Sequence, residues 1–124
     1  MATKFRLLIV AVPSHEEGLK LARGLVEGKL AACVNLVPGV ESLYWWKGKM
    51  EQNNEVLLFI KTQKAQVDTV IGYVRENHPY EVPEVLSLPV TEGNKDYLNW
   101  VGAHTNPAKP IKDLPEQALE KEVG

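Results

Sequence analysis

Four side chains of this sequence carry a thiol or an imidazole, donors that soft or borderline metal ions prefer. They are one thiol, Cys33, and three imidazoles, His15, His78 and His104. Thiolate and imidazole together suit copper and zinc, but a metal site needs several such ligands at suitable distances. The sequence has no Cys-x-x-Cys pair and no closely spaced histidines, so one chain offers no self-contained metal motif. Each residue also has an ordinary interpretation, Cys33 as a small core side chain and the histidines as structural or solvated groups.

The segment around His78 brings several kinds of polar side chain close together in the sequence. Residues 77–84, NHPYEVPE, place an imidazole, a phenol and two carboxylates beside two prolines. A stiff loop that carries such groups is a common place for a binding site. Two interpretations stay open: a site in which Glu81 and Glu84 act as a carboxylate pair, or a rigid connector whose polar groups bond to the backbone and to neighbouring subunits.

Covalent catalysis finds no support in the sequence. Ser14 is explained as a helix cap, and neither a Gly-x-Ser-x-Gly elbow nor a phosphate-binding Gly-rich loop occurs. An acylphosphatase-like enzyme would need a phosphate loop with arginine after its first strand, where this chain has the acidic residues 13–17, PSHEE. The sequence therefore predicts a binding protein and not an enzyme.

Hydrophobic periodicity and the capping, glycine and proline residues predict the helices and strands that carry these groups. The Ser-x-x-Glu pattern at Ser14 is a capping box that starts a helix, and Gly28 is a suitable stop. Pro38 and Gly39 interrupt a strand that resumes beyond them, which predicts a bulge. In chain order we expect a strand at 5–12, a helix from Ser14 to Gly28, a strand at 30–36 resuming at 40–46, a hairpin turn at 47–49, a strand at 55–61, a helix at 64–76, a strand at 84–90 and a short helix at 96–101.

This order is the split βαβ or ferredoxin-like pattern, an α+β fold for residues 1–104. Right-handed crossovers place both long helices on the same face of the sheet. Residues 105–124 are polar, proline-rich and charged, and we expect either a poorly ordered extension or a short docking helix there.

The predicted strands are apolar on both faces. In 5–12 and in 55–61, hydrophobic residues occupy odd and even positions alike, whereas a sheet with one wet face would alternate. Two helices cover one face only, so the other requires a cover, most simply a second copy of the chain. Trp45 and Trp46 then point to opposite sides, one toward its own subunit and one toward a partner. The alternative is a monomer whose C-terminal tail folds over the sheet.

Composition limits the remaining classes of function. The 124 residues suit one domain, and a net charge of −2 without dense lysine or arginine argues against nucleic-acid binding. The apolar run at 7–12 is too short to span a bilayer, so we expect no membrane insertion. A single cysteine excludes an intramolecular disulfide and fits a reducing compartment, which predicts a cytoplasmic protein.

The chain resembles the CutA family of divalent-cation tolerance proteins over about residues 5–102. The resemblance is carried by several separate motifs in ordinary order and spacing. They are KLAACVN at 29–35, YWWKGK at 44–49, EVLL at 55–58, IKT at 60–62, HPYEVPE at 78–84, and Gly93-Asn94 followed by YLNW at 97–100.

The resemblance implies a tight homotrimer of ferredoxin-like subunits that takes part in divalent-metal homeostasis and binds copper or a similar metal ion. Carried over by motif, the metal candidates are Cys33 and His78. Val10 stands where some bacterial relatives have another cysteine, which weakens a thiol-rich copper site. The implied inter-subunit cleft is lined by Tyr44, Trp46, Lys61, Tyr80, Glu84 and Trp100.

Two other functions stay open. A trimer with a polar, aromatic cleft also resembles the PII signalling proteins in plan, which would make the chain a small-molecule sensor. A stable trimer that presents residues 105–124 to another protein would instead be an interaction scaffold.

Overall fold

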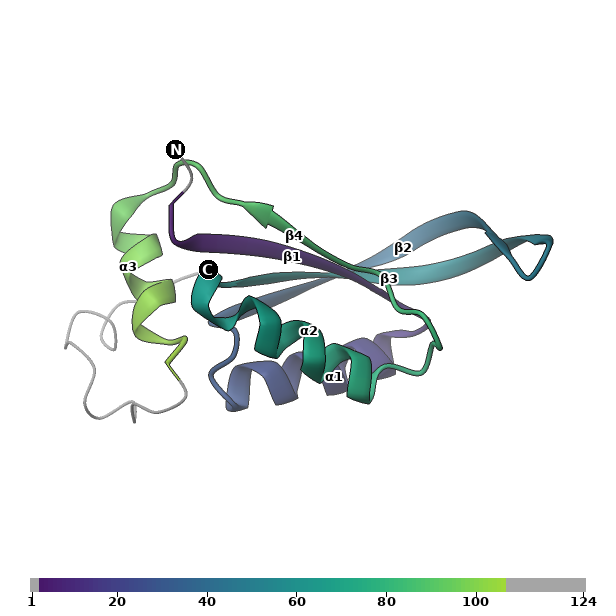
Figure 1. Cartoon of the computed structure of the whole chain (residues 1–124), viewed down its shortest axis with the longest axis horizontal. Coiled ribbons are helices and arrows are strands. Elements are labelled where there is room, and N and C mark those ends of the chain that lie inside the picture. Colours follow the sequence, from purple (N-terminus) through teal and green to yellow (C-terminus); the bar gives the residue numbers. More distant parts are fainter. Residues whose placement is uncertain (1–2, 107–124) are drawn as a thin grey trace.

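A computed structural model of the chain describes residues 3–106. They form a four-stranded antiparallel sheet with three α-helices, and the strand order is β2-β3-β1-β4 (Figure 1). This is the strand order of the predicted split βαβ arrangement. None of the helices in this range is long and apolar enough to cross a membrane. The elements are β1 Phe5–Val12, α1 His15–Glu27, β2 Cys33–Trp46, β3 Lys49–Gln63, the short 3-10 helix η1 Lys64–Gln66, α2 Val67–Asn77, β4 Val85–Pro89 and α3 Lys95–Ala103.

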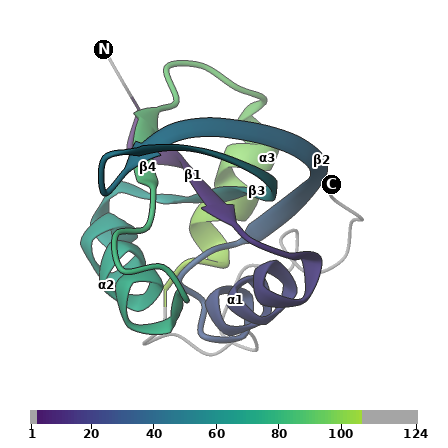
Figure 2. The ribbon, with the colours of Figure 1, turned by 90° about the vertical axis from the view of Figure 1, so that its right-hand side faces the viewer.

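Helices α1 and α2 lie side by side on one face of the sheet, as predicted (Figures 1 and 2). Alternate residues of β1 and β3 point at them and form the core. The fully or nearly fully buried members of this core include Leu8, Val10 and Val12 of β1, Leu58 and Ile60 of β3, Leu21 and Leu25 of α1, and Val70 and Val74 of α2.

The predicted ends of the first helix are correct, and they explain where the next strand begins. Ser14 Oγ accepts a hydrogen bond from the Glu17 N–H, and the Gly28 N–H donates back to the Gly24 carbonyl. The N–H groups of Leu30 and Ala31 then donate to the Leu25 carbonyl. Because these two groups close the helix, β2 begins at Cys33 and not at the predicted residue 30.

Strands β2 and β3 form a long hairpin arm that extends beyond the two helices (Figure 1). The predicted bulge lies between Val37 and Val40, where Gly39 takes a positive φ of 77°. Residues 51–54, predicted to be a loop or a strand margin, are strand, because each pairs with a residue of the long β2. Lys47 and Gly48 form the two-residue turn, both with positive φ, as hairpin turns favour.

The face of the sheet opposite α1 and α2 is apolar and largely uncovered within residues 3–106. It carries the other set of alternate residues, with Ile9 paired to Phe59 on one side and to Leu86 on the other. Leu86 is 55% exposed and Leu88 is 40% exposed. Helix α3 covers only one end, through a small cluster around Phe5, Ala32 and Val101. The predicted bare face is therefore present.

The tryptophan pair lies on the hairpin arm, and neither ring is buried. Trp45 is 74% exposed and pairs across the arm with Met50, while Trp46 is 38% exposed and lines a cavity. One tryptophan was expected to pack toward its own subunit, and Trp46 does so only in part. The alternative cover predicted for the sheet is the C-terminal tail, residues 105–124. All of these except residues 105 and 106 lie outside the described range.

Candidate functional site

A cavity of about 630 Å³ lies where the hairpin arm meets the loop that follows α2. It opens on the same side of the sheet as the uncovered face, because Ala11 and Glu55 belong to the alternate set that points away from the helices. Its lining comes from β1, from both strands of the arm and from the loop. The lining residues are Ala11, Ser42, Leu43, Tyr44, Trp46, Glu55, Pro79, Tyr80, Glu81, Val82 and Glu84.

Three of the side chains that the hairpin arm contributes to the cavity lie on one face of β2. Ser42, Tyr44 and Trp46 are two residues apart, so their side chains leave β2 on the same side. Asn53 on the neighbouring strand donates its Nδ2–H to the Tyr44 hydroxyl at 2.7 Å. This bond fixes the Tyr44 ring on the cavity wall.

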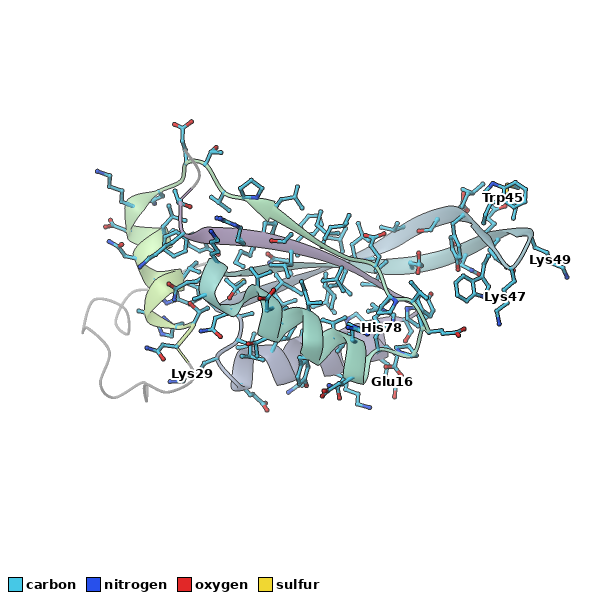
Figure 3. All side chains as sticks on the ribbon, in the orientation of Figure 1. Glu16, Lys29, Trp45, Lys47, Lys49 and His78 are labelled. Carbon is cyan, nitrogen blue, oxygen red and sulfur yellow. The ribbon has the colours of Figure 1, made fainter. Side chains whose placement is uncertain are left out.

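His78 anchors the loop that forms the opposite wall. Its Nδ1 accepts the Tyr80 N–H at 3.0 Å, so the proton resides on Nε2, which lies 2.7 Å from the Ala11 carbonyl and donates to it. The ring is buried, and its centroid lies 4.8 Å from that of Tyr80. Both ring nitrogens are therefore used in holding the 78–84 loop against β1, and Figure 3 shows His78 at the end of α2.

Tyr80 and Glu55 form a hydrogen-bonded pair within the cavity. The Tyr80 hydroxyl donates to Glu55 Oε2 at 2.8 Å, and Glu55 is only 6% exposed. Burial, and then the adjacent Glu55 carboxylate, raise the pKa of Tyr80 far above the usual tyrosine range. The phenol consequently stays protonated and keeps donating to the carboxylate.

The lining of the cavity combines acidic and aromatic groups. Three lining residues are glutamates, three are aromatic and none is basic. Just outside, at the hairpin turn, the Lys47 Nζ lies 5.6 Å from the centroid of the Trp46 ring and 4.0 Å from Glu81 Oε2. Carboxylates and the faces of aromatic rings both attract cations, so the site is suited to a positively charged group.

A second polar cluster lies at the other end of the uncovered face, beneath α3. Lys61 Nζ lies 3.9 Å from Cys33 Sγ and donates to Asn35 Oδ1. Burial, and then the neighbouring Cys33, raise the pKa of Tyr97, whose buried hydroxyl has no oxygen or nitrogen partner within residues 3–106. The Trp100 ring stacks on Tyr97 at a centroid distance of 5.8 Å.

The six predicted cleft residues divide between these two places. Tyr44, Trp46, Tyr80 and Glu84 line the cavity together. Lys61 belongs to the cluster beneath α3, and Trp100 stacks on the α3 residue that lies beside Cys33. That copies of the chain bring these two places together in one inter-subunit cleft stays a prediction.

Sequence reasoning missed Glu55 as a cavity residue. The sequence indicates Glu55 only as the start of a strand and of the EVLL motif, although it shares the face of Leu57 and Phe59. The same face of β3 also carries Asn53 and Lys61, so no local signal distinguishes Glu55, and only its contact with Tyr80 identifies it.

Cys33 and His78 are not brought together within one chain. Cys33 pairs with Lys61 on β3, whereas His78 bonds to Ala11, which pairs with Leu57. Those two positions are four residues apart on β3, or about 13 Å, far more than one metal ion can bridge. No group of three potential ligands among His, Cys, Asp and Glu occurs in the described part of the chain. A single subunit therefore does not fit a metal centre.

Comparisons with known proteins agree with this fold. The family model for CutA1 divalent ion tolerance proteins matches residues 6–104. The divalent-cation tolerance protein CutA of Thermus thermophilus is 42% identical over 99 residues, which are 80% of this chain and 96% of that protein. The CutA homologue of Xenopus laevis is 55% identical over 93 residues, 75% of this chain.

Solved structures give the same result. The Thermus thermophilus divalent cation tolerance protein superposes with a TM-score of 0.80 at 41% identity, over 82% of this chain and 99% of that chain. CutA from Xylella fastidiosa has a TM-score of 0.82 at 34% identity, over 84% and 100% of the two chains. Among curated eukaryotic relatives the match spans 62% of the Xenopus protein and about half of the plant and mammalian ones, such as 54% of the rice protein.

Proposed function

Because this chain belongs to the CutA1 divalent ion tolerance family, we propose that it is a homotrimeric divalent-cation tolerance protein that binds copper or another divalent metal ion and takes part in metal-ion homeostasis. The observation that carries this proposal is the family match over residues 6–104, to relatives whose names state divalent-cation tolerance. The single cysteine supports a cytoplasmic setting for the role.

Assembly into a trimer is supported by the uncovered face of the sheet. Leu86 and Leu88 present apolar surface to water beside Ile9, Phe59 and their neighbours. Apolar surface stabilises an interface by roughly 25 cal/mol for each Å² buried, so a continuous face of this kind favours association. Identical copies are the simplest partners, since each supplies the same face.

Metal binding on this proposal draws ligands from more than one chain. One subunit holds Cys33 and His78 apart, and His78 already uses both ring nitrogens. Cys33 is half-buried and reachable, and a thiolate is a soft ligand that suits copper(I). Cys33 contributed by several subunits is therefore the favoured core of a copper site, with His78 as the second candidate.

The test measures mass and copper binding on the same samples. Light scattering on the full chain should give about three times the 13.8 kDa subunit mass. Calorimetric titration with copper under reducing conditions should lose most of its affinity in Cys33→Ser, with His15→Ala as the matched surface control. The variant His78→Ala separates the second candidate. A lone subunit at low micromolar concentration would contradict the trimer, and unchanged copper binding in both Cys33→Ser and His78→Ala would remove these residues as ligands.

A second candidate function is a trimeric small-molecule sensor with the plan of the PII proteins. The cavity between the arm and the 78–84 loop favours it, because 630 Å³ is in the range of ordinary ligand pockets. A thermal-shift screen with nucleotides and metabolites is the discriminating measurement. The third candidate, a scaffold that presents residues 105–124, concerns a segment almost wholly outside the described residues.

A further inference from the structure

The cavity contains groups that the proposed metal function does not use. Glu55 is more than nine-tenths buried, and only its Oε2 accepts a hydrogen bond, from Tyr80, within residues 3–106. Burying a carboxylate is costly unless it is paired, and a neutral phenol compensates only part of that cost. A cationic partner for Glu55 would complete the compensation. Within one chain no lining residue supplies it, and Lys61 of the implied inter-subunit cleft would have to come from another copy.

The walls of the cavity suggest the kind of cation. Tyr44, Trp46 and Tyr80 present aromatic surface, which interacts well with weakly hydrated organic cations and poorly with strongly hydrated metal ions. A divalent metal ion would also require several converging oxygen ligands. Glu55, Glu81 and Glu84 do not form such a group, since none was found among the described residues. The cavity is thus better matched to an ammonium group on an apolar chain than to a metal ion.

Lys47 shows the expected mode of recognition at the mouth of the cavity. Its Nζ lies 5.6 Å from the Trp46 ring centroid and 4.0 Å from Glu81 Oε2, so one primary ammonium already contacts an aromatic face and a carboxylate. Lys47 sits at the outer end of the arm with Lys49 and Trp45 (Figure 3). Its side chain is 74% exposed, so this contact is weak and readily exchanged.

The geometry points to a binding site for a protonated alkylamine in this cavity, with its ammonium group on Glu55, its alkyl chain against Tyr44 and Trp46, and Lys47 as a weak internal competitor. An N–H of the ligand would donate to the second oxygen of Glu55, which favours primary or secondary ammonium over quaternary. This inference does not rest on the proposed metal function, because a chain that binds no copper would still contain the cavity.

The matched probes are n-butylammonium, which reproduces the end of a lysine side chain, the neutral 1-butanol of nearly the same shape, and n-butyltrimethylammonium. Titrations use the full chain with a chelator present, so copper binding cannot contribute. The readout is the set of ¹⁵N-labelled indole N–H signals of Trp45, Trp46 and Trp100. We expect n-butylammonium to shift Trp46 progressively while leaving Trp45 and Trp100 in place, and 1-butanol to require at least about tenfold higher concentration.

Two variants test the roles of the charged groups. Glu55→Gln keeps the shape and an acceptor for Tyr80, and it should weaken n-butylammonium binding about tenfold or more. Lys47→Gln should tighten binding about two- to fivefold, because it removes the competing ammonium. Lys49→Gln is the control in the same turn and should leave binding unchanged, as Lys49 forms no comparable ring or carboxylate contact within residues 3–106.

Three outcomes would overturn the inference. These are equal binding of 1-butanol, no loss in Glu55→Gln, or a response in Trp45 or Trp100 and not in Trp46. Tighter binding of n-butyltrimethylammonium than of n-butylammonium would overturn the assignment of an N–H donor to Glu55. Failure of these titrations together with intact copper binding would leave the proposed function standing, and the converse would leave the amine site standing.

Discussion

At the scale of single residues, His78 and Tyr80 shape the cavity through their hydrogen bonds. His78 joins the loop to β1 at Ala11 and to Tyr80 at its backbone N–H. Tyr80 in turn holds the carboxylate of Glu55. An imidazole that is buried and bonded at both nitrogens behaves as a structural connector in the single chain. These bonds support the rigid-connector interpretation of this segment, whereas a site with Glu81 and Glu84 as a carboxylate pair stays a prediction.

Tyr80→Phe should destabilise the protein by about 1–2 kcal/mol, because it removes a hydrogen bond to a buried carboxylate. The variant should also lose less unfolding free energy than wild type as the pH rises above 10. The folded state raises the pKa of Tyr80 above its ordinary value of 10.0, so wild-type stability from this group is complete below about pH 10 and falls as the pH rises further.

Urea unfolding of both proteins between pH 8 and pH 11 measures this effect. The difference in unfolding free energy between wild type and Tyr80→Phe should shrink above pH 10. Tyr73→Phe, on α2, serves as the control for the titration of other tyrosines. A constant difference across the range would show that the raised pKa of Tyr80 plays no part in stability.

At the scale of elements, the order of strands and helices was predictable because each boundary has local chemistry. The Ser14 cap, the Pro38-Gly39 bulge and the Lys47-Gly48 turn all occur where the sequence indicated. The errors lie where tertiary pairing overrides propensity. Residues 51–54 are polar and read poorly as strand, yet they pair with β2 because both strands continue along the arm.

The candidate site was predictable only in part, for the same physical reason. Tyr44, Trp46, Tyr80 and Glu84 were named from family motifs, and they do meet in one cavity. Glu55 could not be assigned from local pattern, because its partner Tyr80 is 25 residues away and the contact depends on where the loop crosses the arm. Lys61 and Trp100 would join this cavity only through contacts between copies, which a single chain does not contain.

Alanine substitutions at two glycines should change the stability of the protein in opposite directions. Gly72 lies within α2, has an ordinary helical φ and would place a Cβ in open space, so Gly72→Ala should stabilise the protein by about 0.5–1 kcal/mol. Gly48 has a φ of 79° in the hairpin turn, where a Cβ is also unobstructed. Because an L side chain is strained at this φ, Gly48→Ala should destabilise the protein by about 1 kcal/mol.

Thermal unfolding of the two variants beside wild type checks both signs. Because neither new Cβ meets another atom within 4 Å, packing is constant and the comparison isolates backbone conformation. Equal effects of the two substitutions would show that the turn tolerates a side chain, and the long arm would then owe its register to pairing along β2 and β3 alone.

At the scale of the whole molecule, the dominant feature is the contrast between the two faces of the sheet. One face is closed by α1 and α2 over a core with fully buried leucines and valines. The other face keeps Leu86 more than half exposed beside a row of apolar neighbours, and α3 reaches only one end of it. A cover from further copies would bury this face and would bring the cavity and the Cys33 cluster, both on this side, next to neighbouring subunits.

Leu86→Lys tests the assembly without touching the core. A lysine at the centre of an interface would bury an unpaired charge, so the variant should dissociate to subunits of 13.8 kDa under conditions in which wild type has three times that mass. Val26→Lys is the matched control: Val26 is 41% exposed on α1, on the helix-covered side, and the same substitution there should leave the mass unchanged.

Light scattering and circular dichroism on both variants separate loss of assembly from loss of fold. If Leu86→Lys keeps native secondary structure and becomes monomeric, the uncovered face is the interface, and copper binding through Cys33 of several chains should weaken with it. Binding of n-butylammonium should persist in that monomer, since one chain lines the whole cavity. An unchanged trimer in Leu86→Lys would instead require the copies to meet through the hairpin arm, where exposed apolar residues include Leu43, Trp45, Trp46 and Met50.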